Sequence, residues 1–261
     1  MTVQPNSQRE IILIGIGAGD PSWLTLAAID AIQAIDVLFV VIKEDEYDEL
    51  VEARRQLIAT HRNSELRIVE IKDPPRPWRT TEDYPKAVAT WRRQRQELWT
   101  VALSEDLQPG QRGGFLVWGD PSLYESTLAI IDKVVAADEG LTRRVIPGIS
   151  SPMALAARHG IPLNRQGRGV TIMPARALGD AMPDYLDDVV LMLDPKQTFA
   201  SIPADGIDIY WGAYLGSADE ILISGPLDEV RDEILQVRAE AQQRKGWVFD
   251  IYLLRRRLLE S

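Results

Sequence analysis

The chain has 261 residues, of which 45% are hydrophobic and 26% charged, so it is long enough for one large globular domain or two modest ones. Its formal net charge of −10 argues against general binding of nucleic acid, which needs a basic face, and its lack of cysteine excludes disulfides, thiolate nucleophiles and cysteine-ligated metals. The only two histidines, His61 and His159, are not spaced as a metal pair, so we expect no metal site.

The sequence contains no apolar stretch of the ~18 to 20 residues that a membrane span requires. Its first ten residues, MTVQPNSQRE, also lack the basic and then apolar pattern of a leader segment. We therefore expect a soluble, cytoplasmic protein with neither a membrane nor a nucleic acid as its partner.

The first 160 residues repeat a pattern of strand, loop and helix, which is typical of a largely parallel sheet. The expected strands cover 11–14, 37–42, 66–71, 115–118 and 144–146. The expected helices cover about 25–34, 44–61 and 85–107, a segment after the turn at 119 that ends at about 137, and a segment after 148. Three prolines within 73–78 exclude regular structure there. The helix over 85–107 carries Val88, Trp91, Leu98 and Val101 on its apolar side.

Beyond residue 160 the polar, glycine-bearing segment 161–169 is typical of a linker. Five further blocks follow it, at 170–173, 189–193, 207–214, 220–224 and 247–254, with a helix over 227–244. These indicate a second α/β lobe. We expect an N-terminal lobe over 1–160, with a substrate-side insertion at about 43–113, and a C-terminal lobe over 166–261.

Three strand ends in the first lobe carry glycine. They are GIGAGD at 15–20, Gly119-Asp120-Pro121, and PGISS at 147–151. An open α/β sheet binds its ligand outside the carboxyl ends of its strands, so we expect these turns to converge on one cleft. GIGAGD is neither a dinucleotide fingerprint nor a P-loop, and carboxylates at Asp20 and Asp120 suit a cation, an amine or hydroxyls better than a pyrophosphate. The alternative is that the glycines only form tight turns and the polar residues only cap helices.

The order and spacing of these turns resemble the tetrapyrrole (corrin/porphyrin) methyltransferase family. The segments WGDPSLY and VIPGISSPMALAARHGIPLNR carry the resemblance in the first half, and IYWGAYLGSADEILISGPL and GWVFDIYLLRR carry it in the second. The resemblance implies a two-lobed α/β fold in which each lobe is a mixed, mostly parallel sheet flanked by helices, with the ligand cleft between the lobes.

It also implies an S-adenosylmethionine-dependent C-methyltransferase that acts on a precorrin. The implied reaction takes precorrin-5 to precorrin-6A, with methylation at ring carbon 1 and release of acetate, and leaves S-adenosylhomocysteine. The alternatives are a sister precorrin methyltransferase of the same pathway and a sensor that binds the donor without catalysis. Other branches of the family methylate diphthamide on a protein or ribose in ribosomal RNA. The net charge of −10 argues against RNA as the substrate, and a protein substrate would leave the arginines of residues 43–113 without a role.

A methyl group on a sulfonium carries partial positive charge, which favours a shell of backbone carbonyl oxygens over lysine side chains. Methyl transfer then depends mainly on holding the two reactants in line. The resemblance maps the donor-binding positions onto turns and strand ends of both lobes: Pro21, Gly119, Asp120, Leu123, Ser150, Ser151, Met192, Leu193, Ala213, Tyr214, Leu215, Gly225 and Pro226.

Release of acetate needs water, and the candidates to orient it or accept its proton are Asp20, Asp120 and Tyr124. The substrate carries carboxylates, which arginine binds well, so we assign substrate binding to Arg54, Arg76, Arg79 and Arg92, with Trp78 and Trp118 beside the ring system. Each of these arginines has the alternative of an exposed charge paired with an acid. The family commonly forms homodimers, but no surface of this sequence indicates one.

Overall fold

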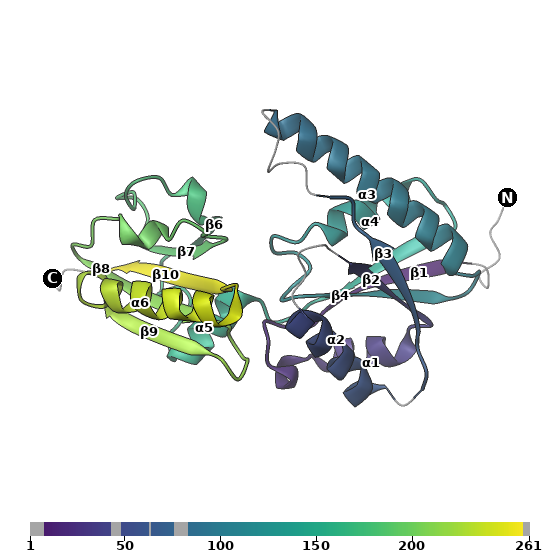
Figure 1. Ribbon diagram of the computed structural model, residues 1–261, viewed down its shortest axis with the longest axis horizontal. Coiled ribbons are helices and arrows are strands. Elements are labelled where there is room, and N and C mark those ends of the chain that lie inside the picture. The colour runs from purple at the N-terminus through teal and green to yellow at the C-terminus, as the bar shows by residue number, and fades with distance from the viewer. Residues whose placement is uncertain (1–7, 43–47, 63, 76–82, 258–261) are drawn as a thin grey trace. The chain divides into compact units, whose positions relative to one another are not determined.

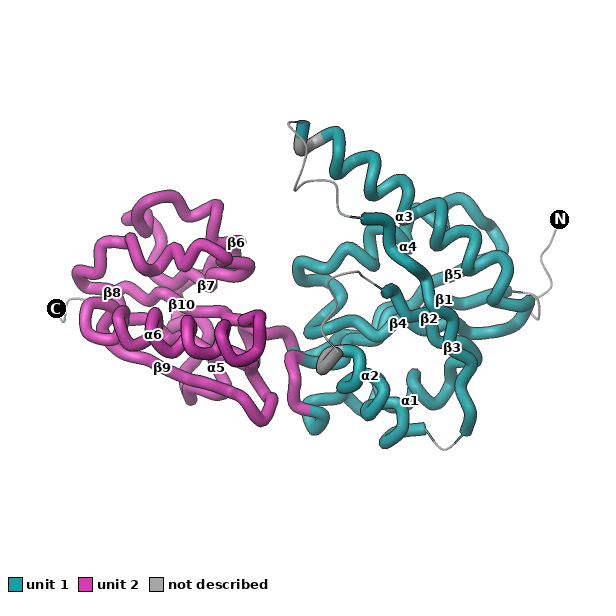
Figure 2. The backbone as a smooth tube through the Cα atoms, viewed as in Figure 1, with its two compact units in different colours: residues 1–17, 21–149 teal, residues 18–20, 150–261 magenta. Residues whose placement is uncertain are grey.

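The computed structural model describes residues 8–42, 48–62, 64–75 and 83–257. The chain divides into two compact units, unit 1 with residues 1–17 and 21–149 and unit 2 with residues 18–20 and 150–261 (Figure 2). Each unit contains one five-stranded sheet, which confirms the two-lobed α/β fold. Among the described residues, no helix is both long and apolar enough to cross a membrane.

Unit 1 is built on a sheet whose neighbouring strands are all parallel, in the order β3-β2-β4-β1-β5. Its strands are β1 (Arg9–Gly15), β2 (Val37–Ile42), β3 (Arg67–Lys72), β4 (Arg112–Val117) and β5 (Leu141–Ile146). The short helix η1 (Pro21–Trp23) and α1 (Leu26–Ala34), α2 (Asp48–His61), α3 (Tyr84–Asp106) and α4 (Thr127–Ala136) connect them. Figure 1 shows α1 and α2 on one side of this sheet and α3 and α4 on the other.

The alternation of side chains along β1 explains why both faces are covered. Ile11 and Leu13 lie in the core cluster that includes residues of α3 and α4, whereas Ile12 and Ile14 lie in the cluster that includes residues of α1 and α2. Successive strand residues point to opposite faces, so a continuous apolar run requires a helix layer on each side. The buried strands expected at 11–14 and 37–42 are confirmed.

The buried side of α3 differs from the one expected from its sequence. Leu98 and Val101 are 42% and 51% exposed, while Trp91, Arg95 and Trp99 are buried at a spacing of four residues. Because Arg95 is charged, the sequence does not indicate that Trp91, Arg95 and Trp99 form one buried side of the helix. Because Trp99 is fully buried in the core of unit 1, α3 is an integral layer of this unit rather than an excursion from it.

Unit 2 has the strand order β6-β7-β10-β8-β9, and there the expectation of a mostly parallel sheet is corrected. Only β6 and β7 pair in parallel, and the other three pairs are antiparallel. The strands are β6 (Thr171–Pro174), β7 (Asp188–Met192), β8 (Ile207–Ala213), β9 (Ile221–Pro226) and β10 (Asp250–Arg256). The helices are α5 (Ser151–His159), η3 (Ala175–Ala177), η4 (Thr198–Ala200) and α6 (Leu227–Lys245). A short connection joins β8 directly to β9, so these two strands run antiparallel. The alternation of strands and helices expected from the sequence does not predict this reversal.

Helix α5 belongs to unit 2, whose longer segment begins at residue 150. His159 Nε2 lies 3.0 Å from the carbonyl oxygen of Trp211 on β8, and Arg158 Nε donates to Glu220 Oε1 at 2.7 Å. Gly160 ends the helix in the left-handed conformation at φ 64°, as is common at helix C-termini.

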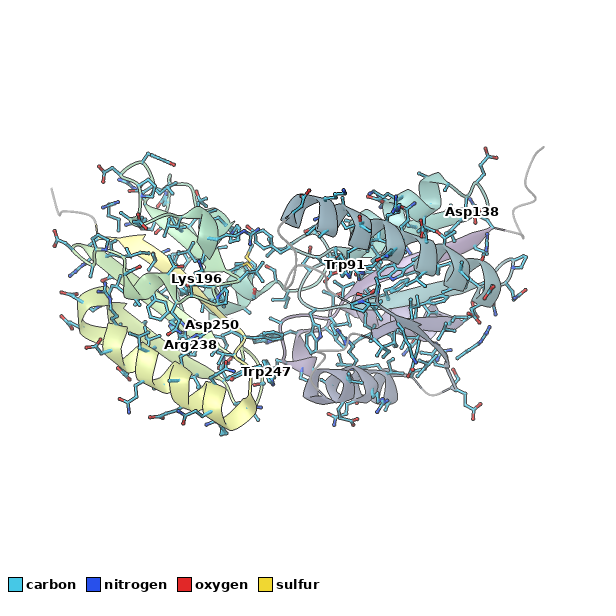
Figure 3. All side chains as sticks on the ribbon, turned by 45° about the horizontal axis from the view of Figure 1, so that its top comes forward. Trp91, Asp138, Lys196, Arg238, Trp247 and Asp250 are labelled. Carbon is cyan, nitrogen blue, oxygen red and sulfur yellow. The ribbon has the colours of Figure 1, made fainter. Side chains whose placement is uncertain are left out.

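Buried ion pairs hold the sheet of unit 2 together. The carboxylate of Asp188, fully buried, accepts from Arg255 Nε at 2.8 Å and from Arg165 Nε at 3.1 Å. Arg238 of α6 points toward Asp250 of β10, with an Nε to Oδ2 distance of 2.8 Å (Figure 3). Burial raises the pKa of Asp250 above its ordinary value, although the hydrogen bond and charge of Arg238 oppose that rise.

Candidate functional site

The three glycine turns of unit 1 meet at the carboxyl ends of β1, β4 and β5. Gly17 N donates to Gly119 O at 3.2 Å and Gly119 N donates to Gly17 O at 2.8 Å. A Cβ atom on Gly15 would lie 2.5 Å from Gly148 N, and one on Gly148 would lie 2.1 Å from Gly119 O. The turns therefore pack backbone against backbone at positions where only glycine fits. The predicted convergence of the three turns is confirmed, and we call this group of turns the glycine crest.

Asp120 links two turns of the glycine crest. Its Oδ2 accepts from Gly148 N at 2.9 Å, and its Oδ1 accepts from Ser122 N at 2.8 Å and from the Ser122 hydroxyl. Partial burial raises the pKa of this carboxyl, but the hydrogen bonds from Ser122 and Gly148 outweigh burial and hold the pKa below its ordinary value. Asp120 is thus ionised at neutral pH, with both oxygens engaged by its own chain.

The residues after Asp120 present side chains from a strained turn. Tyr124 has φ 53° and is 46% exposed, and Leu123 beside it is half-buried. A left-handed backbone at a bulky residue is uncommon and persists where the surroundings enforce it, often at a functional site. Pro21, at the start of η1, is exposed. Tyr124 and Pro21 are therefore exposed side chains of unit 1.

In unit 2 Leu215, which follows β8, lies against Gly19 of the short stretch 18–20. A Cβ atom on Gly19 would be 2.2 Å from the carbonyl oxygen of Leu215, so the loop that carries Asp20 passes directly over that carbonyl. Tyr214 has φ 51°, and its N donates to Phe249 O at 2.9 Å. The structure thus places Gly19, which precedes Asp20, against Leu215, one of the predicted donor-binding positions.

The remaining predicted donor-binding positions divide into two groups. Met192 ends β7, and Leu193 follows it with φ 55° and 56% exposure. On β10, Tyr252 pairs with Leu191 of β7 and Asp250 pairs with Ala213 of β8. The carboxyl ends of β7 and β8 therefore lie at the same end of the strands.

Gly225 and Pro226 lie at the opposite end of the strands of this sheet. Pro226 pairs with Asp208 at the start of β8, whereas Ile221 pairs with Ala213 at its end. Within unit 2 the strand registers therefore separate these two residues from Met192 and Ala213. Ser150 and Ser151 stand at the start of α5, where the Ser150 side chain makes no capping hydrogen bond.

Of the predicted substrate-binding residues, Arg54 and Trp118 come together. The Arg54 guanidinium carbon lies 5.6 Å from the centre of the Trp118 ring, and both side chains line a cavity of about 480 Å³ in unit 1. Arg92 is exposed on α3 and does not line that cavity. Arg76, Trp78 and Arg79 lie outside the described residues.

Two charged residues that also line this cavity, Arg95 and Glu125, have partners within unit 1. Arg95 is 2% exposed, with its Nε 2.8 Å from Asp73 Oδ1 and its Nη1 2.8 Å from Ser126 Oγ. Glu125 Oε1 accepts from the backbone N–H groups of Ser126 and Thr127 at the start of α4. The spacing of Arg95 between Trp91 and Trp99 was the available signal for its burial. Among the described residues, no group of three or more acidic or histidine side chains is arranged to hold a metal ion.

Comparison with known proteins identifies the family. The family model of Tetrapyrrole (Corrin/Porphyrin) Methylases matches residues 10–231 of this chain. The chain belongs to this family. Among the relatives of this methylase, the Precorrin-6A synthase [deacetylating] of Sinorhizobium sp is 43% identical over 252 residues, which cover 95% of each chain.

Solved structures agree with this assignment. A putative cobalamin synthesis related protein (CobF) from Corynebacterium diphtheriae has a TM-score of 0.83 and 30% identity, with 95% of this chain and 99% of that chain covered. The uroporphyrin-III C-methyl transferase of Thermus thermophilus, solved in complex with S-adenyl homocysteine, has a TM-score of 0.55 and 16% identity, with 94% and 91% covered. The second likeness shows the fold alone.

Proposed function

We propose that this tetrapyrrole methylase transfers a methyl group from S-adenosylmethionine to ring carbon 1 of precorrin-5 and releases acetate, which gives precorrin-6A. The observation that carries the proposal is the 43% identity with a deacetylating precorrin-6A synthase over 95% of both chains. Identity spread over both units argues for the same donor, acceptor and reaction, rather than for a shared fold with a different use.

The glycine crest suits a sulfonium donor. Its turns offer backbone oxygens and an ionised carboxylate at Asp120, and no lysine or arginine stands within residues 15–21, 119–124 or 147–151. S-adenosylmethionine supplies an electrophilic methyl group when it is bound. We assign its binding in unit 1 to Pro21, Gly119, Asp120 and Leu123.

In unit 2 we assign donor binding to the positions at one edge of the sheet and at the start of α5. They are Met192, Leu193, Ala213, Tyr214, Leu215, Ser150 and Ser151. We also assign donor binding to Gly225 and Pro226, which the registers put at the opposite end of the strands from Ala213.

The chain's part in the reaction is to position the reactants and handle one water molecule. Release of acetate joins the oxygen of a water to the acyl carbon while the bond from that carbon to the ring breaks. A group that orients this water or accepts its proton must present an open oxygen atom. We assign this role to Asp20, Asp120 or Tyr124; the carboxylate of Asp120 also accepts hydrogen bonds from Gly148 and Ser122. We assign binding of the substrate carboxylates to Arg54, Arg76, Arg79 and Arg92, and we place Trp78 and Trp118 beside the ring system of the precorrin.

Incubation of the purified chain with S-adenosylmethionine and precorrin-5 tests the proposal, with both small products measured by mass spectrometry. We expect S-adenosylhomocysteine and acetate in equal amounts. S-adenosylhomocysteine without acetate would instead indicate a sister precorrin methyltransferase, and tight donor binding without either product would indicate a sensor. A cytoplasmic location and a homodimer remain parts of the proposal, and analytical ultracentrifugation tests the dimer.

A further inference from the structure

The turn that follows β7 has an unusual backbone conformation. Leu193 has φ 55° and Gln197 has φ 57°, and both values lie in the left-handed region, which residues with a Cβ atom adopt at a cost in free energy. The Leu193 side chain is exposed, so its burial does not offset that cost. Contacts of neighbouring residues must therefore hold this segment, which we call the 193–197 turn.

Asp194 supplies such contacts from inside the turn, where it is buried. Its Oδ2 accepts from Thr198 N at 2.6 Å, and its Oδ1 accepts from the Thr198 hydroxyl at 2.8 Å. Its Oδ2 also accepts from the Tyr252 hydroxyl at 2.6 Å, which links the turn to β10, the central strand of the sheet. Three donors thus converge on one buried carboxylate, which needs such partners to stay buried.

Tyr252 gives this carboxylate a fixed partner. Tyr252 and Phe199 are both buried, and their rings pack edge to face with centres 5.2 Å apart. Burial, together with the hydrogen bond to Asp194, raises the pKa of the Tyr252 hydroxyl above its ordinary value, so the hydroxyl keeps its proton and stays a donor. The carboxylate of Asp194 is therefore attached to a rigid part of the core of unit 2.

The 193–197 turn joins this core to two positions that the proposed function assigns to the donor. Met192 ends β7 and Leu193 follows it, and Asp194 comes next in the chain. Because Asp194 is bound to Thr198 and Tyr252, its hydrogen bonds restrict the backbone of the two residues before it. They thereby fix the direction in which Leu193 presents its exposed side chain.

We propose that Asp194 is a positioning residue for the methyl donor, and that its hydrogen bonds to Thr198 and Tyr252 hold the 193–197 turn in the conformation that binds S-adenosylmethionine. This inference rests on the proposed function, which assigns Met192 and Leu193 to the donor. Without these hydrogen bonds the left-handed backbone at Leu193 relaxes, and only a fraction of the molecules presents the turn correctly. The apparent affinity for the donor falls by that fraction.

The first test is calorimetric titration of the full chain with each of two ligands, S-adenosylmethionine and S-adenosylhomocysteine. Asp194→Asn keeps the size of the side chain but replaces one acceptor oxygen by an NH2 group, which cannot accept from Thr198 or Tyr252. We expect the Kd for S-adenosylmethionine to rise about tenfold, as it does when about a tenth of the molecules keeps the competent turn. The Kd for S-adenosylhomocysteine should rise by the same factor, because the turn serves both ligands.

Asp188→Asn provides the matched control. Asp188 is a fully buried aspartate at the start of the same strand, where it pairs with Arg255 and Arg165. The same substitution there should lower stability but leave both Kd values within about twofold, since it does not touch the 193–197 turn. All titrations are made well below the melting temperature of each variant, so that only folded protein is compared.

A second pair of variants applies if Asp194→Asn does not fold. Thr198→Val removes the hydroxyl donor and keeps the backbone N–H, so both Kd values should rise at least about threefold. Thr198→Ser keeps the hydroxyl and should restore the affinity of the unaltered chain. A purely structural role predicts instead that these two variants bind the donor equally well.

Three outcomes would overturn the inference while the proposed function stands. They are unchanged Kd values in Asp194→Asn and Thr198→Val, an equal loss of affinity in Asp188→Asn, and a loss for S-adenosylmethionine alone. The last would assign the effect to the charge of Asp194 acting on the sulfonium rather than to the turn. Absence of donor binding by the unaltered chain would instead contradict the proposed function itself, and this inference with it.

Discussion

Replacement of Gly148 by alanine should disrupt the glycine crest directly. The added Cβ would lie 2.1 Å from Gly119 O and 2.8 Å from the carbonyl carbon of Gly15, and both neighbours are backbone atoms. Moving Gly119 O to an ordinary contact of 3.4 Å needs a displacement of about 1.3 Å. Overpacking of this kind costs roughly 1 to 3 kcal/mol, and we expect about 3 kcal/mol because backbone cannot rotate away. The same displacement moves the β4 and β5 turns apart, so the affinity for S-adenosylmethionine should fall at least about tenfold.

The assay is thermal unfolding of the full chain together with calorimetric titration of S-adenosylmethionine. A loss of about 3 kcal/mol corresponds to a fall of roughly 6 to 12 °C in the melting temperature of a unit of this size. Gly169→Ala serves as the control, since a Cβ atom there meets nothing within 4 Å, and its stability should change by less than about 0.5 kcal/mol. If Gly148→Ala melts and binds the donor as the unaltered chain does, the packing of the crest is not what we describe.

Three further predictions concern polar groups. Asp120→Asn turns an amide toward the N–H of Gly148, so unfolding in urea should show a loss of about 1 to 3 kcal/mol; an unchanged midpoint would contradict the link between the turns. Asp188→Asn breaks a fully buried pair with Arg255 and should cost about 3 to 5 kcal/mol in the same assay, whereas a loss below about 1 kcal/mol would show that the pair contributes little. Burial lowers the pKa of His159 below its ordinary 6.5, so the unfolded chain binds the proton more tightly and stability is lost as pH falls through 6.5. His159→Gln should flatten that decline in melting curves recorded at falling pH, and an unaltered slope would assign it to other groups.

The parallel sheet of unit 1 was predictable because its signals are local. Continuous apolar runs such as 11–14 and 37–42 mark strands buried on both faces, and glycine at the strand ends marks turns that pack closely. The backbone contact between Gly15 and Gly148 follows from that reasoning. Function also followed from the sequence, since the same turns carry the family's motifs.

What the sequence left open depends on partners that are distant in the chain. Arg95 resembles an exposed helix charge until Asp73 and Ser126 are known to meet it. The strand directions of unit 2 depend on which strands become neighbours, and so does the position of Gly225, which the register with β8 places at the opposite end of the strands from Ala213. The short pairing of β2 with β4, which covers two positions, likewise depends on both strands and is not encoded by either one alone.

Transfer of a labelled methyl group tests the central claim most directly. Precorrin-5 is incubated with S-adenosylmethionine that carries 13C in its methyl group, and the products are examined by 13C NMR together with quantification of acetate. Our account predicts one labelled methyl at ring carbon 1 for each acetate released. Label at another ring position, or label at ring carbon 1 with no acetate, would contradict it.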